Sequence, residues 1–141
     1  MKISKSIHVS RSVEDAFRLF TAEIGRWWPL KEGFTFGGER AKDIFLEGRV
    51  GGRFYERYTD GTEFVIGRVT AYEPPRRVAF QWQAPEWEGP TEVEVRFAVE
   101  AGGTRLDLEH RGWEVGPKAA ERGKNYEGGW DKVLGHYASA S

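Results

Sequence analysis

Among the side chains that usually carry catalytic chemistry, His110 has the most promising position in this sequence. It ends the alternating run Leu106, Leu108, His110, so a strand that buries the two leucines also turns the imidazole inward. A neutral imidazole in that place can hydrogen-bond a ligand or act as a general acid–base group. The alternative is a structural histidine that backbone groups or water satisfy. Because no Ser or Asp has the spacing of a catalytic triad, His110 is the single candidate catalytic residue.

The sequence indicates neither a metal site nor a cofactor. His8, His110 and His136 do not have the spacing of metal ligands, and there is no cysteine for a disulfide, a thiolate nucleophile or a zinc site. The glycines at positions 48, 51 and 52 do not form a phosphate-binding loop, because no Lys-Ser/Thr pair follows them. We therefore expect no metal and no cofactor.

The composition is typical of one domain of ordinary size. The 141 residues are enough to bury a core, and we expect a single domain over residues 1–141. The net charge of −1 argues against nucleic acid or an anionic membrane as the partner. The start at Met1–Lys5 lacks the apolar run of a signal peptide, and no segment approaches transmembrane length. We expect a cytoplasmic protein without membrane insertion.

Aromatic residues are frequent, with six Trp, five Tyr and nine Phe beside eighteen Gly. The predicted strands and helices turn several of these rings toward the interior. They either fill the core outright or line a pocket for an aromatic or lipid-like ligand. In the second case the partner is an apolar or aromatic small molecule. Its predicted binding residues are Trp27, Phe34, Phe36, Tyr55, Trp82, His110, Trp113, Tyr126 and Trp130.

A helix over Lys124–Ala138 would position the last of these rings. Its apolar stripe consists of Tyr126, Trp130, Val133, Leu134 and Tyr137. Gly128 and Gly129 interrupt the pattern, and each costs about 1 kcal/mol relative to Ala inside a helix. Either the helix begins near Gly129, or the glycines let a sheet or a ligand approach the helix backbone closely.

The rest of the chain is predicted to be strands with two short helices near the start. Alternation predicts a strand over residues 3–9, Ser12 caps a short helix, and a second short helix ends before Pro29. The segment Leu30–Lys42 is either a lid or a surface loop that tucks its two phenylalanines against the core edge. The further strands are predicted over 44–47, 53–58, 63–72 and 77–82, with a last hairpin between Val93 and Arg111.

The last hairpin permits a prediction of register. If Gly102-Gly103 is a two-residue turn, Phe97 lies opposite Leu108 and Val99 opposite Leu106 on the buried face. The other face then pairs three opposite charges, namely Glu100 with Arg105, Arg96 with Glu109 and Glu94 with Arg111. A slip by one residue would set apolar side chains against charged ones.

These elements predict an α+β domain with a helix-grip fold. The order is one strand, two short helices, about six antiparallel strands and a long C-terminal helix. A sheet of this size with one apolar face buries that face most economically by curling around the long helix.

Several sequence motifs follow one another in an order typical of one family. They are Glu47-Gly48-Arg49-Val50-Gly51-Gly52-Arg53-Phe54, Asp60-Gly61, Gly67-Arg68-Val69, Pro74-Pro75-Arg76-Arg77-Val78, Gly103-Thr104-Arg105-Leu106, Leu108-Glu109-His110 and Gly129-Trp130. With them, essentially the whole chain resembles the activator of heat-shock protein 90 ATPase homologue-like family. This family is part of the START-like (SRPBCC) superfamily, with birch-pollen allergen and polyketide cyclases. The resemblance implies the helix-grip fold, with a cavity between the curved sheet and the C-terminal helix.

Three hypotheses of function follow. The wider superfamily is known chiefly for binding apolar small molecules, so the first is a non-enzymatic protein that holds an apolar or aromatic ligand in the cavity. The second is a cyclase- or dehydratase-like enzyme in which His110 and a tyrosine supply acid–base help. The third is a stress- or chaperone-associated protein that acts through surface contacts, for example at Phe34–Phe36. The eukaryotic namesake uses an additional N-terminal domain for that purpose, and we find no counterpart of it in this sequence. We favour the first hypothesis.

Overall fold

The computed structural model describes residues 2–115 and 119–141 of the chain. The strands are β1 (Ile3–Val9), β2 (Ala41–Leu46), β3 (Arg53–Tyr58), β4 (Glu63–Glu73), β5 (Arg77–Trp82), β6 (Thr91–Glu100) and β7 (Gly103–Arg111). The α-helices are α1 (Val13–Phe20) and α2 (Ala119–Ala140), and the short 3₁₀ helices are η1 (Ile24–Arg26), η2 (Leu30–Glu32), η3 (Gly38–Arg40) and η4 (Trp113–Val115).

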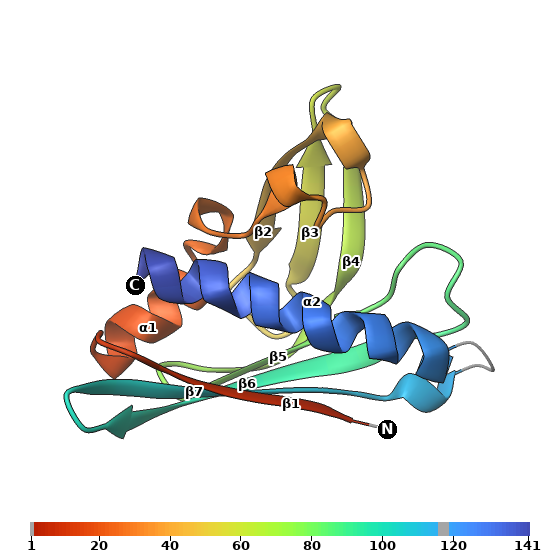
Figure 1. Ribbon diagram of the computed structural model, residues 1–141. Helices are drawn as coiled ribbons and strands as arrows, with labels where there is room; N and C mark the ends of the chain where they lie inside the picture. Colours follow the sequence, from red (N-terminus) through yellow and green to blue (C-terminus); the bar gives the residue numbers. More distant parts are fainter. Residues whose placement is uncertain (1, 116–118) are drawn as a thin grey trace.

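The strands form one antiparallel sheet of seven in the order β1-β7-β6-β5-β4-β3-β2. The sheet curls, so that β2, β3 and β4 rise on one side while β1 and β5 to β7 pass beneath α2 (Figure 1). Helix α2 lies across the concave face, and α1 packs near its C-terminal end (Figure 1). The predicted helix-grip fold is therefore confirmed.

Helix α2 buries the stripe that its sequence pattern predicts. Trp130, Val133, Leu134 and Tyr137 are all buried in the core, and the Tyr137 hydroxyl donates to the carbonyl of Ala16 on α1 over 2.7 Å. The helix is longer than the predicted Lys124–Ala138, because it begins at Ala119. It also continues through both central glycines, since packing of the apolar stripe outweighs their poor helix propensity.

The N-terminal helix forms as its capping pattern predicts. The Ser12 hydroxyl accepts a hydrogen bond from the backbone N–H of Asp15 over 3.2 Å. Helix α1 begins directly after Ser12, at Val13. Its buried face carries Ala16, Phe17, Leu19 and Phe20. This face closes the end of the concave sheet beside α2.

The predicted register of the last hairpin is wrong by two residues. Phe97 lies opposite Leu106, not Leu108, and Glu100 lies opposite Gly103, so that the turn is Ala101-Gly102. Because the slip is even, every side chain keeps its predicted face of the sheet. Val99 lies opposite Thr104 near the hairpin end and is 78% exposed, although we predicted it on the buried side.

The slip also rearranges the predicted charge pairs. Arg96 lies opposite Asp107, not Glu109. The predicted pairs Glu94–Arg111 and Glu100–Arg105 still form ion pairs, at 2.8 and 3.8 Å, although neither pair lies directly opposite across the hairpin. Gly103 belongs to β7, where a Cβ atom would lie 2.1 Å from the carbonyl oxygen of Val9 on β1. The glycine is therefore needed for the close approach of β1, not for the turn.

Candidate functional site

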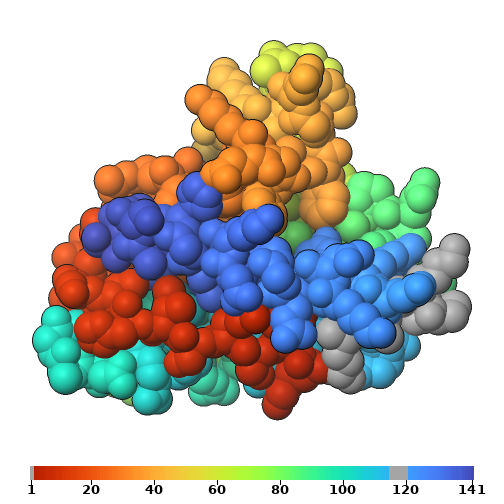
Figure 2. Space-filling view, in the orientation of Figure 1, coloured from red at the N-terminus to blue at the C-terminus, as the bar shows by residue number. Residues whose placement is uncertain are grey.

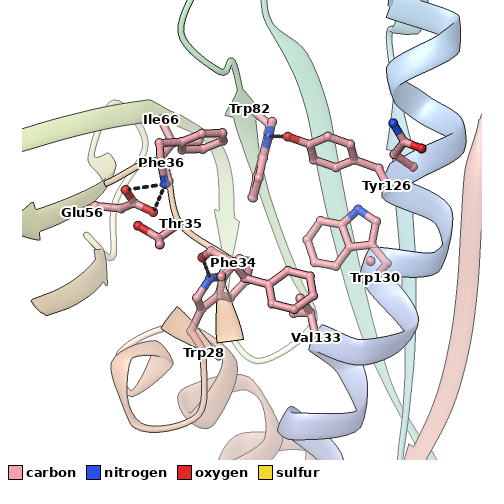
Figure 3. A pocket seen from close by; sticks show the side chains of 13 residues that line it. Trp28, Phe34, Thr35, Phe36, Glu56, Ile66, Trp82, Tyr126, Trp130 and Val133 are labelled. Atoms are coloured by element: carbon pink, nitrogen blue, oxygen red, sulfur yellow. Dashed lines mark hydrogen bonds between the residues drawn. The ribbon is translucent and has the colours of Figure 1, made fainter. Parts of the chain in front are cut away.

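A partly open cavity of about 200 Å³ lies between α2, the sheet and residues 30–40, the segment before β2. Figure 2 shows this segment, coloured orange, lying directly against the blue helix α2. The walls are mostly aromatic and apolar (Figure 3). The lining residues are Trp28, Gly33, Phe34, Thr35, Phe36, Glu56, Ile66, Trp82, Asn125, Tyr126, Gly129, Trp130 and Val133.

Trp82, at the end of β5, is the centre of the aromatic wall. Its ring contacts those of Phe36, Tyr126 and Trp130, with centroids 6.0, 5.7 and 5.8 Å away. Its indole N–H donates to the Tyr126 hydroxyl over 3.0 Å (Figure 3). Burial raises the pKa of Tyr126, so the hydroxyl stays neutral and fixed against the wall.

The segment before β2 covers the cavity and is held there by specific contacts. The indole N–H of Trp28 donates to the carbonyl of Phe34 over 2.9 Å, and Phe36 packs edge-on against Phe64. Gly129 has no side chain, so the ring of Phe34 lies only 3.6 Å from where its Cβ atom would be. The alternative that the helix begins near Gly129 is wrong, because α2 begins at Ala119, and a Cβ atom at Gly129 would make only an ordinary van der Waals contact with Phe34.

Glu56 is the charged residue among those that line the cavity, and our sequence analysis missed it. Its side chain lies at one side of the aromatic wall and is only 1% exposed (Figure 3). The carboxylate accepts hydrogen bonds from the backbone N–H of Phe36 at 3.1 Å and from the hydroxyl of Tyr58 at 2.8 Å. Burial raises the pKa of Glu56, although Tyr58, Phe36 and Thr35 act to lower it through hydrogen bonds.

A signal for Glu56 was present in the sequence. Strand residues 54, 56 and 58 share one face, and the flanking Phe54 and Tyr58 are apolar enough to mark that face as buried. A glutamate between them is therefore expected to be turned inward. Glutamate is seldom fully buried without a partner, and such a position is a candidate functional site.

His110 lies behind the cavity wall rather than on it. It is fully buried, its Nδ1 accepts from the indole N–H of Trp130 over 3.0 Å, and its Nε2 lies 2.7 Å from the Thr91 hydroxyl. Desolvation lowers its pKa from 6.5 to about 3, so the imidazole is neutral at ordinary pH. Both ring nitrogens are thus engaged by protein groups, as a structural histidine requires.

The other predicted ligand-binding residues divide into two groups. Phe34, Phe36, Trp82, Tyr126 and Trp130 line the cavity together, whereas Trp27, Tyr55 and Trp113 lie elsewhere. The indole of Trp27 donates to Leu19 near α1, and that of Trp113 donates to the carbonyl of His110 behind Tyr126.

Tyr55 is outside the cavity because strand neighbours alternate between the two faces of a sheet. It follows Phe54 on β3, so its ring packs against Phe45 with centroids 5.2 Å apart, under the guanidinium of Arg53. Our prediction overlooked this alternation, which turns Tyr55 to the face of the sheet opposite that of Phe54.

The described part of the chain contains no group of three or more His, Cys, Asp or Glu side chains that could hold a metal ion. None of the helices in residues 2–115 and 119–141 is long and apolar enough to cross a membrane. What the cavity offers chemically is therefore aromatic surface, one carboxyl group and a few neutral polar groups.

A curved antiparallel sheet that grips a long C-terminal helix, with an apolar cavity between them, defines the START-like (SRPBCC) class. The family model for Activator of Hsp90 ATPase homolog 1-like proteins matches residues 10–139. The chain therefore belongs to this family. No curated protein gives a significant match.

Two solved structures are similar to this chain over nearly its whole length. Protein MLL2253 from Mesorhizobium loti is 18% identical with a TM-score of 0.73, over 99% of this chain and 95% of that one. The Aha1 dimer from Colwellia psychrerythraea is 22% identical with a TM-score of 0.67, over 99% and 95%. Both share the fold.

A third solved structure is more similar in sequence. It is described as an anthrahydroquino-gamma-pyrone synthase, Txn09, complexed with SUM. It is 36% identical to this chain with a TM-score of 0.55, over 77% of this chain and 75% of that one.

Proposed function

We propose that this protein binds a small, mainly apolar aromatic molecule in the cavity between α2 and the curved sheet. The observation that carries the proposal is the cavity itself, with about 200 Å³ of space enclosed by the rings of Phe36, Trp82, Tyr126 and Trp130. Water occupies about 30 Å³ per molecule, so the space corresponds to about seven waters on a largely apolar surface. Replacing such water with an aromatic ligand is favourable.

The size of the cavity limits the ligand. A dry apolar cavity of about 150 Å³ takes one benzene ring, so 200 Å³ that is open on one side suits one or two fused rings. A larger molecule would project through the opening. The similarity to a synthase whose name contains a pyrone supports an aromatic or polyketide-like compound as the ligand class.

The enzymatic alternative needs a different residue from the one we first named. His110 has both nitrogens engaged and does not line the cavity, whereas the carboxyl group of Glu56 does. A cyclase-like reaction in this cavity would therefore depend on Glu56 for proton transfer. The similarity to a synthase is the observation that favours this second function.

Binding is best tested through the indole N–H signals of the tryptophans in ¹H–¹⁵N NMR spectra. We expect a panel of one- to three-ring aromatic compounds to shift the signals of Trp28, Trp82 and Trp130 saturably, because these three line the cavity. Assignment by single Trp→Phe variants identifies each signal. A medium-chain fatty acid serves as the apolar, non-aromatic comparison.

Two adjacent glycines provide matched variants for this test. Gly129→Leu places a side chain in the cavity, whereas Gly128→Leu adds the same group where a Cβ atom has nothing within 4 Å. We expect the first variant to abolish binding and the second to preserve it. Unchanged binding by Gly129→Leu, or no saturable shift with any compound in the unmodified protein, would contradict the proposed function.

A further inference from the structure

Glu56 is a buried carboxyl group without a cation. Among the side chains that the structure describes, no Lys, Arg or His forms an ion pair with it, although most other glutamates on the sheet pair with arginines. The guanidinium of Arg40 lies over the ring of Tyr58, 4.8 Å from its centroid, and so contacts the neighbour rather than the carboxylate. Burying a carboxyl group without a cation is costly, which makes a structural role alone a poor explanation.

The hydrogen bonds to Glu56 leave part of its capacity unused. A carboxylate offers about four acceptor positions. The Phe36 N–H is shared between the two oxygens at 3.1 and 3.3 Å, and the Tyr58 hydroxyl donates to Oε1. The hydroxyl of Thr35 also favours the charged form of the group. These three donor hydrogens leave about one acceptor position, on a residue that lines the cavity.

The other polar groups of the cavity lie away from Glu56. Figure 3 shows Glu56 and Thr35 on one side of Phe36 and Trp82, with Tyr126 on the other side. The Tyr126 hydroxyl already accepts from the Trp82 indole. A flat ligand along the aromatic wall thus meets a carboxyl group at one end and only neutral polar groups at the other, so the cavity distinguishes the two ends of its ligand.

We propose that Glu56 determines ligand specificity, and that the cavity takes a phenol whose hydroxyl donates to the Glu56 carboxyl group while its one or two rings lie against Trp82. This inference rests on the proposed function and names its ligand class. The aromatic wall supplies most of the contact area, and Glu56 supplies orientation and selectivity. A ligand with an ether or a hydrogen in place of the hydroxyl leaves the acceptor unpaired, which a buried polar site penalises.

A hydroxyl suits this site better than a protonated amine does. Burial raises the pKa of Glu56, and the same desolvating surroundings penalise the entry of an ammonium group. Both forms of the carboxyl group still have an oxygen that accepts from a neutral hydroxyl. The phenolic ring also keeps its hydroxyl in the ring plane, where it reaches Glu56 without leaving the wall.

The test compares three naphthalene derivatives by calorimetric titration: β-naphthol, its methyl ether, and naphthylmethylammonium. We expect β-naphthol to bind at least about tenfold more tightly than the ether, since a hydrogen bond to a charged acceptor exceeds the roughly 1.4 kcal/mol of a tenfold ratio. In Glu56→Gln this preference should fall to about threefold or less, because the acceptor loses its charge. The affinity for the ether should change little.

Glu94→Gln is the matched control, since it makes the same change at a buried carboxyl group that does not line the cavity. It should leave the preference of β-naphthol over its ether unchanged. Equal binding of β-naphthol and the ether, or an undiminished preference in Glu56→Gln, would overturn the role of Glu56 while leaving the proposed function intact. Tighter binding of the ammonium compound than of β-naphthol would overturn the inferred ligand class, because the cavity would then prefer a cation to a phenol. If none of the three binds, the inference falls together with the proposed function.

Discussion

The indole N–H of Trp130 on α2 donates to Nδ1 of His110 on β7 over 3.0 Å, and this bond fixes the state of the imidazole. An indole nitrogen only donates, so Nδ1 carries no proton and Nε2–H donates to the Thr91 hydroxyl. Thr91 donates in turn to the carbonyl of Trp82, over 2.7 Å. A neutral histidine thus links α2 to three neighbouring strands, directly behind the aromatic wall of the cavity.

Replacing His110 should flatten the dependence of stability on pH. The unfolded chain takes up a proton near pH 6.5, whereas burial lowers the pKa in the folded protein to about 3. Folded stability is therefore lost as pH falls below about 6.5, by about 2 to 3 kcal/mol between about pH 7 and about pH 4.5. His110→Gln should be less stable near pH 7 but lose less on acidification. Urea unfolding across this range measures both effects.

Tyr137→Phe is the control for general destabilisation. It removes the buried hydrogen bond to the Ala16 carbonyl, while burial raises the pKa of Tyr137 far above the range tested. The variant should lower the free energy of unfolding by about 1 kcal/mol at every pH. An equal pH slope in His110→Gln and in the unmodified protein would mean that the histidine titrates normally.

Thr91→Val tests the link between His110 and the strands. Valine has a similar shape but cannot accept from the imidazole N–H, which would leave that buried donor unpaired. We expect a loss of about 1 to 3 kcal/mol in the free energy of unfolding. Thr91→Ser keeps the hydroxyl and should cost less than the valine variant. The reverse order in urea titrations would show that methyl packing, not the hydrogen bond, is what Thr91 contributes.

Glu56 should have a pH effect of the opposite sign to that of His110. Its pKa is raised in the folded protein, so the folded state keeps a proton that the unfolded state loses above about pH 4.5. Stability therefore falls as pH rises through this window. Relative to the unmodified protein, Glu56→Gln should become more stable as pH rises above about 4.5. Thermal unfolding measured at intervals of pH follows the difference.

Glu94 provides the contrast for Glu56. Its burial acts to raise the pKa, but hydrogen bonds from Arg77 and Arg111 outweigh that effect and lower it. The folded protein gains stability as pH rises from the lowered pKa to the ordinary value, and Glu94→Gln loses this gain. The opposite result would be a fall in the stability of Glu56→Gln, relative to the unmodified protein, as pH rises, as expected for Glu94→Gln. It would show that the hydrogen bonds to Glu56 outweigh its burial and lower its pKa.

Two glycines should respond in opposite ways to alanine. At Gly128 a Cβ atom has nothing within 4 Å, so Gly128→Ala should stabilise α2 by about 0.5 to 1 kcal/mol. At Gly103 it would lie 2.1 Å from the carbonyl oxygen of Val9, so Gly103→Ala should cost about 3 kcal/mol or more. Thermal unfolding compares the two. A tolerated Gly103→Ala would mean that β1 is not held close to β7.

The sequence by itself determined the fold class and most of the aromatic wall. Periodicity of two residues indicates the strands and periodicity near 3.6 indicates α2, and both are local properties of the chain. For the same reason the sequence predicted that Trp82 and Trp130 point inward, and they lie in the core with centroids 5.8 Å apart. It also gave the face of the sheet for the residues of the last hairpin, but neither the register nor the exposure of Val99 at the hairpin end.

Only the tertiary structure decided which inward-facing side chains line the cavity and which are packed against other side chains. Gly103 belongs to β7 and not to the turn, and β1, distant in sequence, approaches it closely. His110 and Glu56 both face inward, yet one meets Trp130 and Thr91 while the other reaches the cavity. Burial follows from local alternation, whereas free space depends on how the segment before β2 packs against α2, and no local pattern encodes that contact.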